Sequence, residues 1–265
     1  MERLTIFAKG NLDVRDTLHV LRVGGSVRWN GINEVLRTHV PTAVARVRHE
    51  TMTRSDGLLA ATGAVPPALA ARALPLGPYP ASVQFSRALF DADADAYVLT
   101  IQPDIAVHLW RNRDDGTLLM THDLPKWIAA DRRWFESNYE ATGYLDPEAS
   151  MRNLAAIVAR LRERSDAPIL VYNVSSVVPG DSAHCLAGHG ETLATRIRRF
   201  NVALAGLSER TGVSIVDVDA VVARGGADRL KLDAFHLNAD GCRVVAEEVV
   251  RVLDELGAFA ARERA

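Results

Sequence analysis

The sequence predicts an α/β fold in which a parallel sheet of about five strands carries helices on both faces. Five short apolar runs alternate with longer segments whose apolar residues recur at helical spacing, which is typical of such sheets. The runs are apolar at nearly every position, as strands buried on both faces are. The chain has 265 residues, of which 48% are hydrophobic, so we expect one domain over residues 1–265.

Each apolar run is short enough to be a strand, and each amphipathic segment is long enough to be a helix. The predicted strands are Leu4–Ala8, Ala43–Val47, Ala96–Ile101, Pro168–Tyr172 and Val213–Asp217. The predicted helices are Asp13–Leu21, Ile32–Leu36, Lys126–Tyr139, Pro147–Arg164, Thr192–Arg210 and a C-terminal helix that begins at Asn238. Between Asp56 and Leu89 the chain is rich in Ala and Pro, which predicts short helical pieces that cover the sheet.

Composition excludes several classes of protein. The net charge of −2 argues against nucleic acid as the main partner. The two cysteines, Cys185 and Cys242, form neither a disulfide framework nor a metal-binding motif. The chain starts directly with a strand-like run, and it has no apolar stretch of membrane length. We therefore expect a cytoplasmic protein without a nucleic-acid or membrane partner; the oligomeric state stays open.

The loops that follow the predicted strands are the expected place for a site, because ligands bind beyond the carboxyl ends of parallel strands. These loops are Gly10–Asp13, His49–Ser55, Gln102–Asp104 and Asn173–Ser176. We expect the loop that carries Asp233 and His236 to join them at the same edge.

Asp233 precedes His236 by three residues on a tight loop. At that spacing the carboxylate can hold the imidazole in one tautomer and leave the other ring nitrogen as a base. Asn238 is a favoured N-cap residue for the helix that follows. The alternative interpretation is a capped surface helix with an incidental histidine.

The residues Asp233, His236, Asn238 and Gly241 resemble the last sequence block of the SGNH (GDSL) hydrolase superfamily, Asp-x-x-His-x-Asn-x-x-Gly. The remaining segments fit this superfamily in their order along the chain. The resemblance implies a flavodoxin-like SGNH-hydrolase fold, a small-molecule substrate with an ester or acyl bond, and triad roles for Asp233 and His236.

The other blocks depart from the superfamily pattern. Gly10-Asn11-Leu12-Asp13 stands where the resemblance implies a Gly-Asp-Ser nucleophile block, so Leu12 takes the place of serine. No glycine follows the second strand until Gly57, and Pro103 stands where an oxyanion-binding asparagine is expected. A histidine base without a nucleophile does not support ordinary serine-esterase chemistry.

Three functions remain open. The first is a small-molecule enzyme that uses the His236–Asp233 base without serine, for hydrolysis, acyl transfer or proton transfer, with Asp13 as nucleophile or second acid/base. Asp13 has a simpler alternative, because an aspartate in the first turn of a helix stabilises the helix dipole. The second is a serine esterase whose nucleophile is Ser175, Ser176 or Ser26. The third is a non-catalytic binding or accessory protein.

Further polar residues are candidates for contact with a substrate. The predicted substrate-binding residues are Asn11, Gln102, Asp104, His49, Ser176 and Asn238. His49 and Glu50 could form a metal site with Asp13, Asp104 and His236, but their spacing matches no known ligand motif, so we expect no metal and no other cofactor. The loop Asp181–His189 is predicted to be a lid or a substrate wall.

Overall fold

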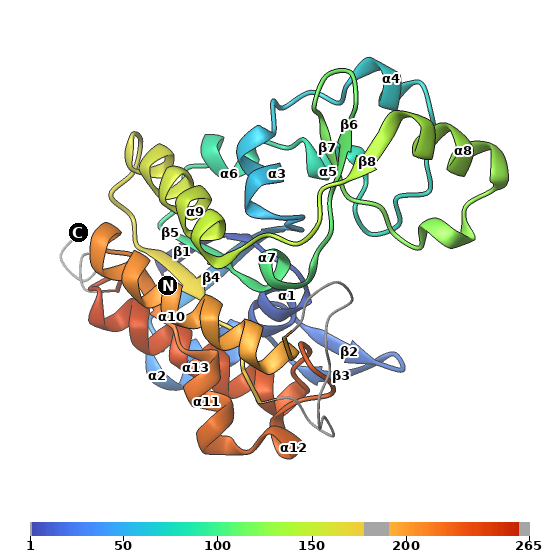
Figure 1. Ribbon diagram of the computed structural model, residues 1–265. Coiled ribbons are helices and arrows are strands. Elements are labelled where there is room, and N and C mark those ends of the chain that lie inside the picture. The colour runs from blue at the N-terminus through green and yellow to red at the C-terminus, as the bar shows by residue number, and fades with distance from the viewer. Residues whose placement is uncertain (1, 178–190, 260–265) are drawn as a thin grey trace.

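A five-stranded parallel sheet forms the centre of the molecule. The computed structural model describes residues 2–177 and 191–259 (Figure 1). The strands are β1 (Glu2–Lys9), β4 (Ala43–Glu50), β5 (Ala96–Thr100), β9 (Ile169–Tyr172) and β10 (Ser214–Val216). They lie in the order β10-β9-β5-β1-β4, and every pairing is parallel. The predicted α/β fold with about five parallel strands is confirmed.

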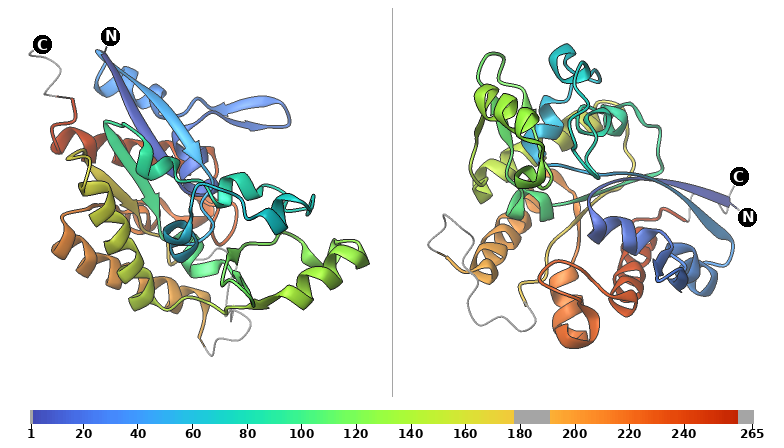
Figure 2. Two further views of the ribbon diagram at one scale, coloured as in Figure 1. Left: turned by 90° about the horizontal axis from the view of Figure 1, so that it is seen from above. Right: turned by 90° about the vertical axis from the view of Figure 1, so that its right-hand side faces the viewer.

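Helices cover both faces of this sheet, because alternate strand residues contribute to two separate apolar clusters. One face packs against α1 (Leu12–Leu18), α2 (Ile32–His39), α11 (Val218–Gly225), α12 (Ala227–Leu230) and α13 (Ala239–Glu255). The other face packs against α3 (Ser55–Ala60), α6 (Ala88–Asp91), α7 (Gln102–Ala106), α9 (Pro147–Arg162) and α10 (Leu193–Thr211). Figure 2 shows these two helical layers from further directions.

A smaller lobe extends from the sheet and has its own aromatic cluster (Figure 1). Its strands β6 (Trp110–Asn112), β7 (Leu118–Leu119) and β8 (Tyr139–Ala141) form an antiparallel sheet in the order β7-β6-β8. Its helices are α4 (Pro67–Ala70), α5 (Ala81–Gln84), the 3₁₀ helix η1 (Leu124–Lys126) and α8 (Ala129–Asn138). The predicted helix over Lys126–Tyr139 therefore begins too early, since η1 and a short break precede α8.

A hairpin replaces the predicted end of the first helix. The helix α1 ends at Leu18, and the strands β2 (Leu21–Val23) and β3 (Ser26–Trp29) follow. The prediction of a helix to Leu21 was wrong, whereas the predicted loop at Gly24 and Gly25 is the turn of this hairpin, and Ser26 begins β3. Gly24 and Gly25 both have positive φ angles, which a tight two-residue hairpin turn requires.

None of the helices in the described ranges combines the length and the apolar character needed to cross a bilayer.

Candidate active site

The loop that carries Asp233 and His236 is held by short-range hydrogen bonds between α12 and α13. Lys231 and Leu237 form an antiparallel bridge across its base, and the Leu232 N–H donates to the His236 carbonyl at 2.8 Å. The Asp233 Oδ1 atom accepts from the backbone N–H groups of Phe235 and His236 at 2.9 and 2.8 Å. The backbone is therefore fixed in the conformation that presents the histidine.

The carboxylate and the imidazole contact each other directly. The distance between Asp233 Oδ2 and His236 Nδ1 is 2.7 Å, which places the proton on Nδ1 and leaves Nε2 as a base. Burial acts to raise the pKa of Asp233, but the hydrogen bonds from His236 and from the two backbone N–H groups bring this pKa below its ordinary value. The His236 side chain is 42% exposed, and no described residue hydrogen-bonds to Nε2.

Asn238 and Gly241 build the frame of this loop. The Asn238 side chain accepts from the Gly241 N–H at 3.0 Å and donates to the Arg229 carbonyl at 2.6 Å, so the predicted N-cap is confirmed and both ends of the amide are occupied. A Cβ atom on Gly241 would lie 2.2 Å from the Leu230 carbonyl oxygen. Only glycine allows α13 to begin this close to the backbone before the loop.

The segment Gly10–Asp13 follows β1, with Leu12 as the first residue of α1. The Asp13 Oδ2 atom accepts from the Thr100 hydroxyl at 2.6 Å, whereas Oδ1 is enclosed and has no hydrogen-bond partner among the described residues. Burial raises the pKa of the Asp13 carboxyl, and the hydrogen bond from Thr100, the backbone groups of Val14 and Asn11 and the charge of His236 oppose this only in part. Asp13 is thus a carboxyl group that lies near His236 and has one unused oxygen.

Asn11 and Gln102 join two strand ends. The Asn11 Nδ2 group donates to Gln102 Oε1 at 3.0 Å. The other amide atom of Asn11, Oδ1, is enclosed without a partner in the described part of the chain. Asn11 therefore keeps one unpaired amide oxygen, as Asp13 keeps one unpaired carboxylate oxygen.

A narrow pocket brings the strand ends and the histidine loop together. Its lining residues are Asp13, Gln102, Tyr172, Asn173, Val174, Ser175, Val218, Lys231, Ala234, Phe235 and Leu237. The free interior is about 10 Å³, which is roughly room for one water molecule. His236 is not among the lining residues, but both of its sequence neighbours are. This geometry agrees with the expectation that the loops after the strands and the loop of His236 meet at one edge of the sheet.

Tyr172 and Lys231 are polar lining residues that the sequence analysis did not predict. The Tyr172 side chain is 1% exposed, and its hydroxyl has no hydrogen-bond partner in the described residues. The Lys231 Nζ atom donates to the Val177 carbonyl at 2.6 Å and to the Ala234 carbonyl at 2.9 Å. Two features of the sequence could have pointed to Lys231: lysine is rare in this chain, and Lys231 stands two positions before Asp233.

Of the six predicted substrate-binding residues only Gln102 lines this pocket, whereas Asn11, Asp104, His49, Ser176 and Asn238 do not. Asp104 is fully buried and accepts from the Ser55 N–H at 2.7 Å and from the Ser150 hydroxyl at 2.5 Å. His49 donates from Nε2 to the Gly10 carbonyl at 2.8 Å. The backbone N–H and the hydroxyl of Ser176 both donate to the Asp219 carboxylate.

The proposed metal ligands do not gather. Glu50 pairs with Lys9 at 2.8 Å. Over residues 2–177 and 191–259, no group of three or more His, Cys, Asp or Glu side chains is placed to hold a metal ion. The predicted lid Asp181–His189 lies outside the described residues.

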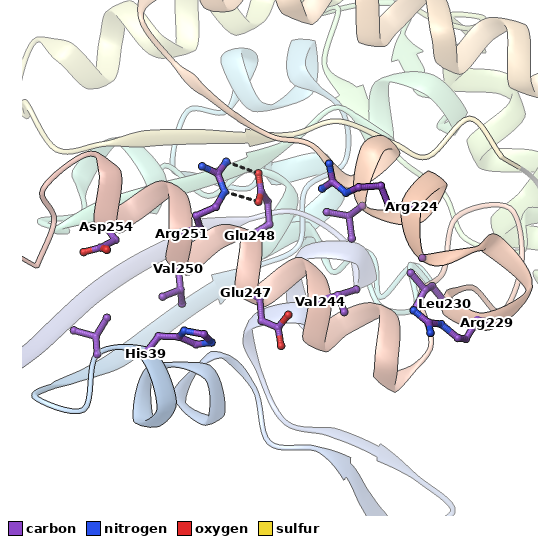
Figure 3. A pocket seen from close by; sticks show the side chains of 13 residues that line it. His39, Arg224, Arg229, Leu230, Val244, Glu247, Glu248, Val250, Arg251 and Asp254 are labelled. Atoms are coloured by element: carbon purple, nitrogen blue, oxygen red, sulfur yellow. Dashed lines mark hydrogen bonds and ion pairs between the residues drawn. The ribbon is translucent and has the colours of Figure 1, made fainter.

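A wider groove lies between α2 and the helices α11, α12 and α13 (Figure 3). It is lined by charged helix surfaces, and Arg251 donates two hydrogen bonds of 2.7 Å to Glu248. None of the predicted site residues lines it. We therefore place the candidate site in the narrow pocket at the strand ends.

A protein-family model matches part of the chain. Residues 122–244 match the model of the GDSL-like Lipase/Acylhydrolase family. These comparisons support the SGNH hydrolase superfamily. The matched segment includes the Asp233–His236 loop and ends before the C-terminus of α13; the segment Gly10–Asp13 lies outside it.

Several solved structures share the fold at low sequence identity. A protein from Slackia heliotrinireducens assigned to the SGNH hydrolases is 15% identical, with a TM-score of 0.51 over 95% of this chain and 100% of its own. The acetyl xylan esterase AlAXEase is 12% identical, with a TM-score of 0.52 over 95% and 100%. LAE5, an alpha/beta hydrolase enzyme from the metagenome of Lake Arreo, is 16% identical, with a TM-score of 0.51 over 97% and 96%. A search of curated proteins found no match.

Proposed function

We propose that this chain is a small-molecule enzyme that uses the SGNH scaffold with an altered active site. The observation that carries this proposal is the 2.7 Å contact between His236 and Asp233. Other residues of the loop that holds them line the pocket. In the proposed reaction His236 is the general base, and Asp233 fixes its tautomer. Water or a substrate hydroxyl replaces serine as the nucleophile, because Leu12 has no nucleophilic atom.

Asp13 is the second acid/base in this proposal. Its unpartnered Oδ1 atom can accept a hydrogen bond from the attacking water or hydroxyl. A pKa that burial has raised makes protonation of this carboxyl easier, which favours proton exchange over nucleophilic attack. Asn11 and Gln102 form the neighbouring wall.

The proposed substrate is a small ester or acyl compound. The family match is to lipases and acylhydrolases, and AlAXEase is an esterase, which supports hydrolysis or acyl transfer. Elimination and cyclisation need only the base, so proton-transfer chemistry belongs to the same proposal. The cytoplasmic location and the expected lack of nucleic-acid, membrane and cofactor partners stay predictions.

A relocated serine is the second candidate, since Ser175 lines the pocket. Its hydroxyl accepts from the Val177 N–H at 3.3 Å and donates to the Val177 carbonyl at 3.4 Å. Both contacts are those of a local turn, and they favour a structural role. A serine-dependent enzyme would be labelled by a fluorophosphonate probe, and we expect no labelling.

The deciding experiment is turnover of a panel of small p-nitrophenyl and alkyl esters by the His236→Ala variant. We expect a loss of about 10²–10⁴-fold, the usual contribution of a general base, with an unchanged melting temperature. The control is His122→Ala, which removes a histidine of similar exposure. Equal turnover in His236→Ala and the parent chain would refute the proposal. Ester binding without any turnover would instead identify a binding protein.

A further inference from the structure

The buried lysine of the pocket has a position that suggests a direct part in the reaction. We propose that Lys231 is a further catalytic residue, whose ammonium group donates a hydrogen bond to the substrate carbonyl oxygen as that oxygen gains negative charge. This inference rests on the proposed function, because it requires a carbonyl substrate attacked next to His236.

The first argument is the rigid placement of Lys231 relative to the histidine. Lys231 is 6% exposed, and its backbone pairs with Leu237 across the base of the catalytic loop. Its Nζ atom donates to the Ala234 carbonyl, inside the loop, and to the Val177 carbonyl, beyond β9. The ammonium group and the imidazole are therefore held by the same short stretch of backbone.

The second argument is the lack of an ion-pair partner. Buried lysines are normally paired with a carboxylate. No carboxylate of the described residues lies within 4.0 Å of Lys231 Nζ, unlike Lys9, which contacts Glu50 at 2.8 Å. Asp219 and Asp233 act on Lys231 from a longer distance, and Asp13 lines the same pocket. A buried ammonium group that no carboxylate of the described residues contacts is well suited to an anionic oxygen.

Burial lowers the pKa of Lys231 to about 8, although Asp219 and Asp233 raise it in part. The folded pKa lies above neutrality, so most molecules carry the charge at pH 7. The positive charge is lost as the pH rises through about 8.

The third argument is a count of hydrogen-bond donors. An ammonium group has three N–H bonds, and two of those on Lys231 are used by backbone carbonyls. Gln102 accepts from Asn11 through Oε1, which leaves its NH₂ group to donate. Lys231 and Gln102 both line a pocket with room for about one water-sized group, such as a carbonyl oxygen. Lys231 and Gln102 would donate hydrogen bonds to the substrate carbonyl oxygen in place of Pro103, which has no N–H group.

The proposed step balances as follows. His236 Nε2 takes a proton from water while the water oxygen bonds to the ester carbon, and the carbonyl electron pair moves to the oxygen held by Lys231. The pair then returns, the bond from carbon to the alcohol oxygen breaks, and His236 gives its proton to that oxygen. The products are a carboxylic acid and an alcohol.

The test combines turnover with binding of acetate, a small anionic probe that requires no turnover. We expect Lys231→Met to lower kcat by about 10²-fold or more, as loss of an oxyanion donor does, and to weaken acetate binding measured by NMR at least tenfold. Lys231→Arg keeps the charge and is expected to bind acetate better than Lys231→Met. His236→Ala is expected to keep acetate binding. The control Lys9→Met removes the other buried lysine and is expected to lower the melting temperature without loss of acetate binding.

The parent chain supplies a test that needs no folded variant. Its affinity for acetate is expected to fall as the pH rises through about 8, because Lys231 loses its charge there. Affinity that is constant from pH 7 to 9, or equal in Lys231→Met and the parent chain, would overturn the role of Lys231. If acetate binding depends on Lys231 but the chain turns over no ester, anion binding by Lys231 in the pocket is supported and the proposed function is refuted.

Discussion

The Asp233–His236 loop and the Gly10–Asp13 segment lie at the same edge of the sheet and differ in how their polar atoms are satisfied. In the loop, both oxygens of Asp233 have partners within three residues. In the segment, Asn11 Oδ1 and Asp13 Oδ1 are enclosed and have no partner among the described residues. Buried polar atoms are rarely left unpaired in a folded protein.

This difference separates two kinds of site residue. The loop is complete by itself, so its geometry exists before any ligand arrives. The segment is incomplete by itself, and its unused acceptors gain partners only when a ligand or water donates to them. We infer that the loop supplies the base and that the segment contacts the substrate.

The largest expected effect comes from the loop. Asp233→Asn preserves the acceptor for the N–H groups of Phe235 and His236, but it places an NH₂ group opposite His236 Nδ1 and so favours the wrong tautomer. We expect kcat/KM to fall on the order of 10²–10⁴-fold at an unchanged melting temperature. Asp240→Asn, an exposed carboxylate on α13, is the control. Full activity in Asp233→Asn would remove the distinction between the two regions.

A smaller effect is expected from the Gly10–Asp13 segment, and it concerns the stability of the fold. The folded-state pKa of Asp13 is raised above its unfolded value, so its ionisation destabilises the fold. The penalty is absent below an unfolded pKa of about 3.9 and grows as the pH rises through the folded pKa. Asp13→Asn should therefore gain melting temperature over the parent chain between pH 4 and 8, by about 2–4 °C for each kcal/mol. Exposed Asp166→Asn should show no such trend; a constant difference for Asp13→Asn would contradict the raised pKa.

The smallest effect on the fold is expected at Leu12. This side chain is 38% exposed, so Leu12→Ser should change the free energy of unfolding by no more than about 0.5 kcal/mol. The new hydroxyl should introduce fluorophosphonate labelling, and the additional change His236→Ala should abolish it. Leu256→Ser, at another exposed leucine, is the control. Labelling that does not depend on His236 would show that position 12 is not aligned with the base.

The parts of the structure that could be predicted from the sequence are those determined by residues close together in the chain. The strand β5 and the residues Ile6–Ala8 of β1 are buried and largely apolar, and the Asn238 cap and the Asp233 turn depend on neighbours within three residues. The strands of the small lobe were missed because two or three residues of mixed polarity give no periodic signal.

The residues that the sequence could not place depend on contacts over long separations. Asp104 is an acidic residue after a strand, and only its contacts with Ser55 and Ser150, more than 45 positions away in each direction, show that it is buried structure. Lys231 is another such case, because its ammonium group contacts the carbonyl of Val177, which follows β9 and lies 54 positions earlier in the chain. Contacts between residues so far apart in the chain form only in the tertiary fold, and no sequence spacing predicts them.

The narrow pocket joins residues from Asp13 to Leu237, so its walls come from nearly every part of the sheet's carboxyl edge. Such a pocket cannot exist in the unfolded chain. Any compound that occupies it binds the native state alone and shifts the folding equilibrium towards that state by mass action. Thermal denaturation in the presence of small compounds therefore detects those that bind the native state, before any reaction is known.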